Sequence, residues 1–280
     1  MRVNANRKQE QAEYSLARHT KLLGSAVFVV GRNPYEYIEN DLRTLNHYHD
    51  WDTASIEINH DNPSVTVSTN RGISKTAIYH ESLGCTLLPE DESDVYFDPI
   101  NIKSELDDPT TMEWPMGSQN ATAHNPSDVD RKTLSRTLDQ VTSTNPPQGM
   151  PSDTRAIVVL KEGKIVGERY ASGYNKNTQH VSWSMGKSVT SALIGILIEE
   201  GHFDVDDPAP IDAWRDDPRS QITISDLLRM SSGLDFRRST DEKDTVPCVK
   251  EDHHHRVYYD PIDIFEFVTG RSLELNPNTE

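Results

Sequence analysis

The feature that most constrains the fold of this chain is an uncharged, largely apolar run over residues 188–198. Its apolar residues recur at the spacing of one helix face: Val189, Leu193, Ile196 and Leu197. Gly201 follows, and its missing Cβ suits the C-terminal end of a helix. A helix without charge over several turns is expected to be buried on most sides. The sequence therefore predicts a core helix that begins near Ser184, with Leu193 inside the core.

Two β-rich runs precede this helix in "RAIVVLKEGKIVGERY". The turn between them, residues 161–164, places Gly163 where a positive φ is easiest, which predicts a β-hairpin. A short helix is expected over residues 129–141, after a linker at 114–127 that is rich in Pro, Gly, Asn and Ser.

The region from Ala26 to Leu88 is typical of short strands separated by turns. The predicted strands are "AVFVV", "ASIEINH", "SVTVST", "KTAIYH" and "CTLL". Downstream of the apolar run, Ser225 is expected to cap a short helix that ends near Gly233, and "DPIDIFEFVTG" predicts another helix, closed by Gly270.

Composition excludes several classes of function. The chain has 280 residues, with 28 Lys and Arg against 45 Asp and Glu, for a net charge of -17. Because no excess of cations is available to neutralise phosphates, no nucleic acid and no anionic membrane is expected as a partner. Two cysteines, Cys85 and Cys248, cannot form a disulfide framework. Cys85 is expected to be a small buried hydrophobe in a strand.

Neither an export signal nor a membrane span is expected. The N-terminal sequence is polar, and its first apolar run, "SAVFVV", is too short for a secretory signal, so a cytoplasmic location is predicted. A periplasmic or secreted location is the alternative if the true N-terminus lies upstream. The run from Val189 to Ile198 is too short to cross a bilayer. The oligomeric state stays open.

Ser184 and Lys187 are the candidate catalytic residues. A serine hydroxyl becomes a good nucleophile only when a base takes its proton, and a spacing of three places both side chains on one helix face. The N-terminal end of the helix dipole disfavours an ammonium ion and favours a developing alkoxide. A capping serine and a solvated lysine would give the same spacing without chemistry, so the motif alone leaves both interpretations open.

Further segments occur in an order that carries a resemblance. They are "DTRAIVVLKEGKIVGERYASGY", "WSMGKSVTSALIGILIEEG", "DPAP", "DPRSQITISDLLRMSSGLDF" and "LELNPNTE". Together they resemble the β-lactamase-related serine hydrolases, within them the class C-like group of 6-aminohexanoate-dimer hydrolases and esterases. The resemblance implies an α+β fold of the serine β-lactamase/DD-peptidase type, with a sheet flanked by helices, over residues 127–280. A smaller β-rich region and linker is expected over residues 1–126.

The resemblance also implies the chemistry. Ser184 would be the acylated nucleophile, Lys187 the base, and the Ser184 backbone N–H one oxyanion donor. The substrate would be a small-molecule amide or ester, and no cofactor is expected. The family's Tyr-x-Asn or Tyr-x-Ser motif and its Lys/His-Thr-Gly-like strand do not follow Ser184 in this sequence. The prediction is therefore a member that is incomplete at its C-terminus, with weak or no activity.

Two alternatives to this function stay open. One is a β-lactamase or peptidoglycan carboxypeptidase. The other, from a different class, is a non-catalytic fragment or binding protein, because the loss of a base or an oxyanion donor costs ~10²–10⁴ in rate.

No metal site is expected. In "HYHDW", which begins at His47, Trp51 stands where a metallo-hydrolase pattern needs Asp. The run 253–255 of three histidines is expected to be a solvated loop. Tyr258 and Tyr259 are expected either to pack or to line a cleft entrance.

Overall fold

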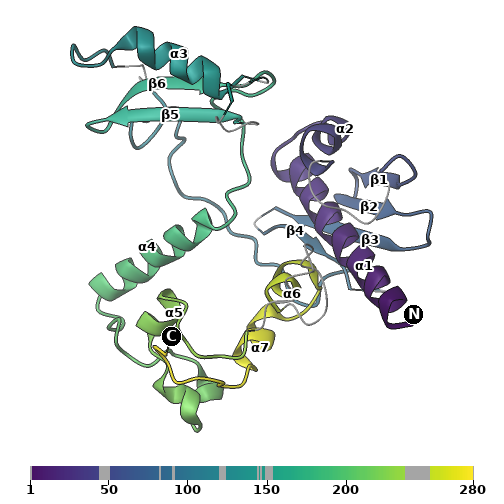
Figure 1. Ribbon diagram of the computed structural model, residues 1–280. Coiled ribbons are helices and arrows are strands. Elements are labelled where there is room, and N and C mark those ends of the chain that lie inside the picture. Colours follow the sequence, from purple (N-terminus) through teal and green to yellow (C-terminus); the bar gives the residue numbers. More distant parts are fainter. Residues whose placement is uncertain are drawn as a thin grey trace. The chain divides into compact units, whose positions relative to one another are not determined.

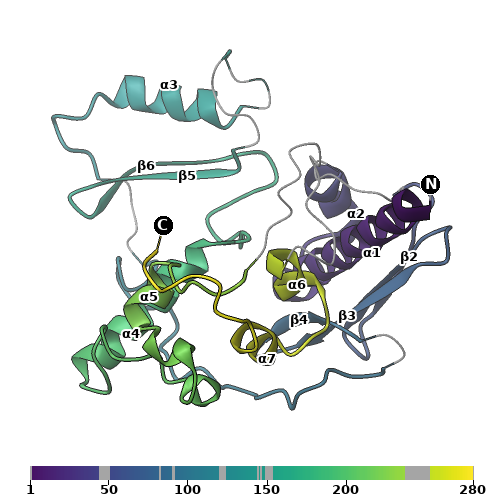
Figure 2. The ribbon, with the colours of Figure 1, turned by 60° about the horizontal axis from the view of Figure 1, so that its bottom comes forward.

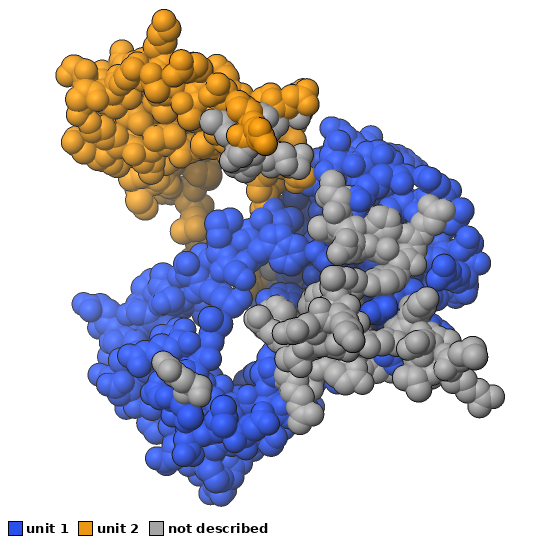
Figure 3. All heavy atoms as spheres, viewed as in Figure 1, with its two compact units in different colours: residues 1–101, 181–280 blue, residues 102–180 orange. Residues whose placement is uncertain are grey.

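The computed structural model has helices and strands in both halves of the chain (Figures 1 and 2). It forms two compact units, coloured separately in Figure 3: residues 1–101 together with 181–280, and residues 102–180. The domain boundary expected after residue 126 stays a prediction. The structure describes residues 2–43, 51–81, 83–89, 92–119, 124–143, 145, 147–148, 154–236 and 253–279.

The first unit contains a four-stranded antiparallel sheet whose strands are paired in sequence order. The alternation that predicted β2 is confirmed: Val65 and Val67 are fully buried, whereas the Ser and Thr residues between and beside them are partly exposed. Four of the five predicted strands are thus present. They are β1 (Ser55–Asn59), β2 (Ser64–Ser68), β3 (Ser74–His80) and β4 (Gly84–Leu87).

Helix α1 (Arg2–Gly24) lies against one face of this sheet (Figures 1 and 2). Leu16 and Leu23 are fully buried in the same cluster as Val65 and Val67. The sequence analysis did not predict this helix, because charged residues separate its apolar positions. The buried stripe along it is nevertheless enough to cover the sheet.

The predicted strand over residues 26–30 is wrong. The segment η1 (Ser25–Val29) is a π-helical turn that continues directly from α1. A short apolar run fits a strand or a helix equally well, and the helical path buries Ala26 in the same cluster as Leu16. Two short helical segments follow, α2 (Pro34–Tyr37) and η2 (Ile38–Leu42).

The second unit contains the predicted hairpin, β5 (Ala156–Lys161) and β6 (Lys164–Tyr170), which is confirmed. Glu162 and Gly163 have φ of 51° and 74°, the backbone that a tight hairpin turn requires. Helix α3 (Arg131–Val141) confirms the helix expected over 129–141 and packs on β6. Gly167 allows this approach, because a Cβ there would lie 3.0 Å from a methyl carbon of Leu138.

Helix α4 (Met185–Glu199) forms where the apolar run predicted it, and Gly201 follows with φ of 76°. The prediction that this helix is buried is wrong. Leu193 is 56% exposed, Val189 and Ile196 are exposed to a similar extent, and no residue of the helix is buried. Absence of charge makes burial favourable, but burial also needs a covering surface, and the described residues of the first unit provide none over this helix.

The segment after α4 forms short helices around capping side chains. Helix α5 (Ile224–Leu228) is capped by Thr223 rather than by Ser225, so the predicted cap is wrong by two positions. The Thr223 hydroxyl accepts from the Asp226 N–H, and the Asp226 carboxylate accepts from the Thr223 N–H in return. Of the two predicted helices in this segment, α5 ends at Leu228 rather than near Gly233, and α7 (Ile264–Thr269) is confirmed.

The three histidines at 253–255 begin helix α6 (His253–Tyr259), so the loop predicted there is wrong. Residues that follow them pack on α1: the Tyr14 hydroxyl donates to Asp260, and Tyr259 is buried in a cluster with Tyr14, Ala77 and Cys85. These tertiary contacts stabilise a helix that the local sequence, with three adjacent imidazoles, does not favour by itself.

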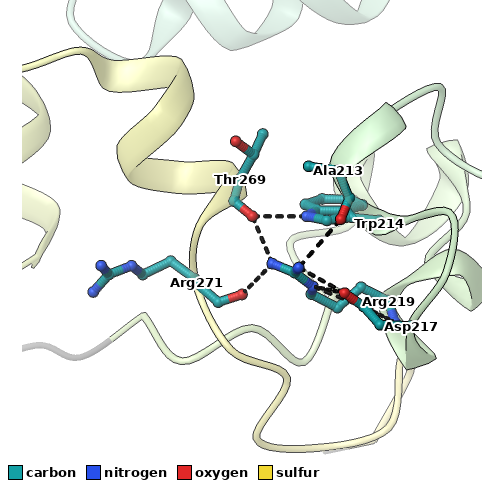
Figure 4. Close-up of polar contacts among 6 residues, drawn as sticks. All are labelled: Ala213, Trp214, Asp217, Arg219, Thr269 and Arg271. Carbon is teal, nitrogen blue, oxygen red and sulfur yellow. Dashed lines mark hydrogen bonds and ion pairs between the residues drawn. The ribbon is translucent and has the colours of Figure 1, made fainter.

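Arg219 ties the two 3₁₀ turns after α4, η3 (Asp212–Trp214) and η4 (Pro218–Gln221), to the end of α7 (Figure 4). Its guanidinium donates to the main-chain oxygens of Thr269 and Arg271 at 2.6 and 2.9 Å, and to the carboxylate of Asp217 at 2.7 Å. The Trp214 indole N–H donates to the same Thr269 oxygen. The hydrogen bonds that Asp217 accepts from the side chain and the main-chain N–H of Arg219 lower the pKa of Asp217 below its usual value.

Candidate active site

Ser184 is the N-cap residue of α4, the position where a chain enters a helix. Its side chain makes no capping hydrogen bond, so the hydroxyl is not used to complete the helix end. The residue is exposed. This arrangement differs from the structural role that a serine usually plays at this position, where its oxygen accepts from the helix N–H groups.

Lys187 lies one turn into the helix and reaches back to Ser184. Its Nζ is 3.1 Å from Ser184 Oγ, which is hydrogen-bond distance. The contact that the spacing of three predicted is therefore present. A lysine amine in this position is within reach of the hydroxyl proton that a base would have to remove.

The main-chain N–H groups at the start of α4 differ in whether they are hydrogen-bonded. The N–H groups of Met185, Gly186 and Lys187 donate to the carbonyl oxygens of Ser182, Trp183 and Ser184, at 3.0, 3.2 and 3.0 Å. Among the described residues, no hydrogen bond from the Ser184 N–H is found. An unused N–H at the positive end of a helix is suited to stabilise a developing oxyanion.

Trp183, which the sequence analysis did not single out, borders this site. Its φ is 45°, and the residue is 53% exposed. The guanidinium carbon of Arg18, on α1, lies 5.8 Å from the centroid of this ring. No local pattern could have indicated Arg18, because the contact joins residues that are far apart in the sequence.

Other residues that the sequence singled out lie elsewhere. Tyr259 is buried in the core and Tyr258 is partly exposed, its carbonyl oxygen accepting from Lys21. Cys85 is buried in β4 as expected, and burial raises its pKa to about 11, so the thiol is protonated at neutral pH.

His47 and the rest of its motif up to residue 50 lie outside the described residues, as do the side chains at 253–255. Within the part of the chain that the structure describes, no group of three His, Cys, Asp or Glu side chains is arranged to hold a metal ion. None of the described helices is long and apolar enough to cross a membrane.

Comparison with known proteins connects this geometry to a family. Residues 148–264, which include Ser184, Lys187 and all of α4, match the Beta-lactamase family model. The match covers less than half of the chain.

One relative makes the similarity more specific. Over 126 residues, the chain is 29% identical to the 6-aminohexanoate-dimer hydrolase of Paenarthrobacter ureafaciens. The alignment covers 41% of this chain and 31% of that protein, so this chain matches about a third of the relative's length. No solved structure matches.

Proposed function

We propose that this protein is a serine hydrolase that cleaves an amide or ester bond through an acyl-enzyme on Ser184, with Lys187 as the base. The observation that carries the proposal is the 3.1 Å contact between Lys187 Nζ and Ser184 Oγ at the start of α4. This contact lies within the segment that matches the Beta-lactamase family.

In the proposed reaction, Ser184 Oγ attacks the substrate carbonyl carbon while its proton moves to Lys187 Nζ. The carbonyl oxygen becomes an oxyanion, which the Ser184 N–H stabilises together with the dipole of α4. When the tetrahedral intermediate collapses, the bond to the leaving group breaks and the leaving group takes up the proton. Attack by water on the resulting ester then releases the acid and restores the serine.

The substrate class follows from the same site. A serine nucleophile can attack the carbonyl carbon of an amide or an ester, and the relative is a 6-aminohexanoate-dimer hydrolase. We therefore propose a small-molecule amide or ester as the substrate. A β-lactam is the second candidate, because the family model is that of the β-lactamases.

A fluorophosphonate probe tests the proposal. We expect slow phosphonylation of the 280-residue protein, located on Ser184 by peptide mass spectrometry. The labelling is expected to be slow because residues 185–280 contain no Tyr-x-Asn or Tyr-x-Ser motif that could assist proton transfer.

The matched controls are two serine variants. Ser184→Ala should abolish labelling, whereas Ser188→Ala, one residue beyond Lys187, should leave its rate within ~2-fold of wild type. Labelling that persists in Ser184→Ala, or wild-type protein that takes up no probe, would contradict the proposal. The rates of hydrolysis of p-nitrophenyl acetate and of a chromogenic β-lactam are then compared. The faster of the two reactions indicates which substrate class the protein prefers.

A further inference from the structure

The residue before the proposed nucleophile has an unusual backbone. Trp183 has φ of 45°, in the left-handed region that bulky L-residues rarely adopt. Such a conformation costs free energy and persists only where the surrounding structure holds it. A contact that holds Trp183 is therefore expected nearby.

Arg18 provides this contact. Its guanidinium carbon lies 5.8 Å from the centroid of the Trp183 ring, within the range of a cation–π interaction. The Nε atom of Arg18 is buried, and among the described residues it has no hydrogen-bond partner. The interaction with the ring is therefore made by a guanidinium that is partly shielded from water, which strengthens it.

The backbone of Trp183 determines the direction of a group in the proposed reaction. The carbonyl of Trp183 and the N–H of Ser184 belong to one planar peptide unit, so they turn together. The carbonyl accepts from the Gly186 N–H at 3.2 Å, which aligns this peptide unit with the axis of α4. If Trp183 relaxed to a negative φ, the peptide unit would rotate and the Ser184 N–H would no longer point to the same place.

We propose that Arg18 and Trp183 form a positioning pair, in which Arg18 holds the Trp183 ring and the left-handed backbone of Trp183 orients the Ser184 N–H toward the substrate carbonyl oxygen. The inference rests on the proposed function. It assigns to α1 a role in the reactivity of Ser184.

A double-mutant cycle tests the pair, with labelling of Ser184 by the fluorophosphonate probe as the readout. Arg18→Met keeps the apolar stem and removes the charge, and it should slow labelling by ~3–30-fold. Trp183→Ala should slow it at least as much, and Arg18→Met should have no further effect in the Trp183→Ala background. Arg18→Lys, which keeps the charge but not the planar group, should fall between wild type and Arg18→Met.

The variant Trp183→Gly distinguishes the effect of the backbone conformation at residue 183 from the effect of the indole ring. Glycine adopts a positive φ without steric cost, so Trp183→Gly should label faster than Trp183→Ala although both lack the ring. Equal rates for these two variants would contradict the role of the left-handed backbone. An Arg18→Met effect that is the same with and without Trp183 would also overturn the proposal, because Arg18 would then act directly on the probe.

Amide hydrogen exchange provides a readout that does not depend on activity. In Arg18→Met, the amides of Met185 and Gly186 should exchange at least ~3-fold faster, while α5 keeps its wild-type rates and the melting temperature stays within ~2 °C. Unchanged exchange at these two amides would overturn the positioning pair. If wild-type protein takes up no probe, the proposed function fails. The exchange rates of the Met185 and Gly186 amides then decide by themselves whether Arg18 holds the backbone at Trp183.

Discussion

Helices α1 and α4 both belong to the first unit, yet they are stabilised differently. Helix α1 carries charged residues along its length, and it buries Leu16 and Leu23 completely against the sheet. Helix α4 is uncharged over residues 188–198, and none of its residues is buried. The difference shows that burial depends on a surface to pack against, whereas mean hydropathy only determines how favourable such packing would be.

The largest effect that this comparison predicts is on the α1 side. Leu16→Ala removes a fully buried side chain from a packed cluster, so it should lower the free energy of unfolding by ~2–5 kcal/mol. Denaturant unfolding followed by far-UV circular dichroism measures the change. A loss below ~1 kcal/mol would mean that α1 is not packed on the sheet in solution.

A smaller effect is expected at the hydrogen bonds of Arg219, which join η3 and η4 to the end of α7. Arg219→Met keeps the stem but leaves the main-chain oxygens of Thr269 and Arg271 without this donor, so it should destabilise the protein by ~1–3 kcal/mol. Arg215→Met is the matched control, because Arg215 is 73% exposed and pairs with an exposed carboxylate, and it should cost less than ~0.5 kcal/mol. Equal effects of the two variants in the same unfolding assay would contradict the role of Arg219.

Acidification should weaken the same network. The Arg219 hydrogen bonds hold the pKa of Asp217 below 3.8, so the stabilisation is present above that pH and is lost as the pH falls through the lowered pKa. Asp217→Asn removes this titration. Its melting temperature should therefore fall less between pH 5 and ~pH 2.5 than that of wild type. An equal fall in both proteins would show that Asp217 is not linked to folding.

The smallest effect is expected on the α4 side. Leu193→Ala truncates a side chain that is 56% exposed, so the free energy of unfolding should change by less than ~0.5 kcal/mol. The variant is compared with Leu16→Ala under identical conditions. A loss as large as that of Leu16→Ala would restore the buried helix that the apolar sequence predicted.

Local patterns in the sequence were sufficient for much of the fold. The alternation in residues 64–68 and the glycine turn at Gly163 each act over a few residues, and both predictions are confirmed. The segment 25–29 was assigned wrongly because its apolar run suits a strand as well as the helical turn that buries Ala26. Helix α6, which begins at the three histidines, contacts α1 through residues that follow them, and no local pattern indicates such contacts.

The candidate site also contains one contact that the sequence could predict and one that it could not. The contact between Lys187 and Ser184 follows from helix geometry and could be predicted from the spacing alone. The left-handed backbone of Trp183 and its contact with Arg18 could not be predicted, because they depend on how a distant helix packs.

The most direct test of the account is the effect of Lys187 on the reactivity of Ser184. Labelling of the Ser184 peptide by the fluorophosphonate probe is followed over time in wild type, Lys187→Met and Lys176→Met, the last being a control on an exposed turn. Because a positioned base contributes ~10²–10⁴ in rate, Lys187→Met should label ~10²–10⁴-fold more slowly than wild type, while Lys176→Met keeps the wild-type rate. Wild-type labelling in Lys187→Met would contradict the account, because the 3.1 Å contact would then have no part in activating the serine.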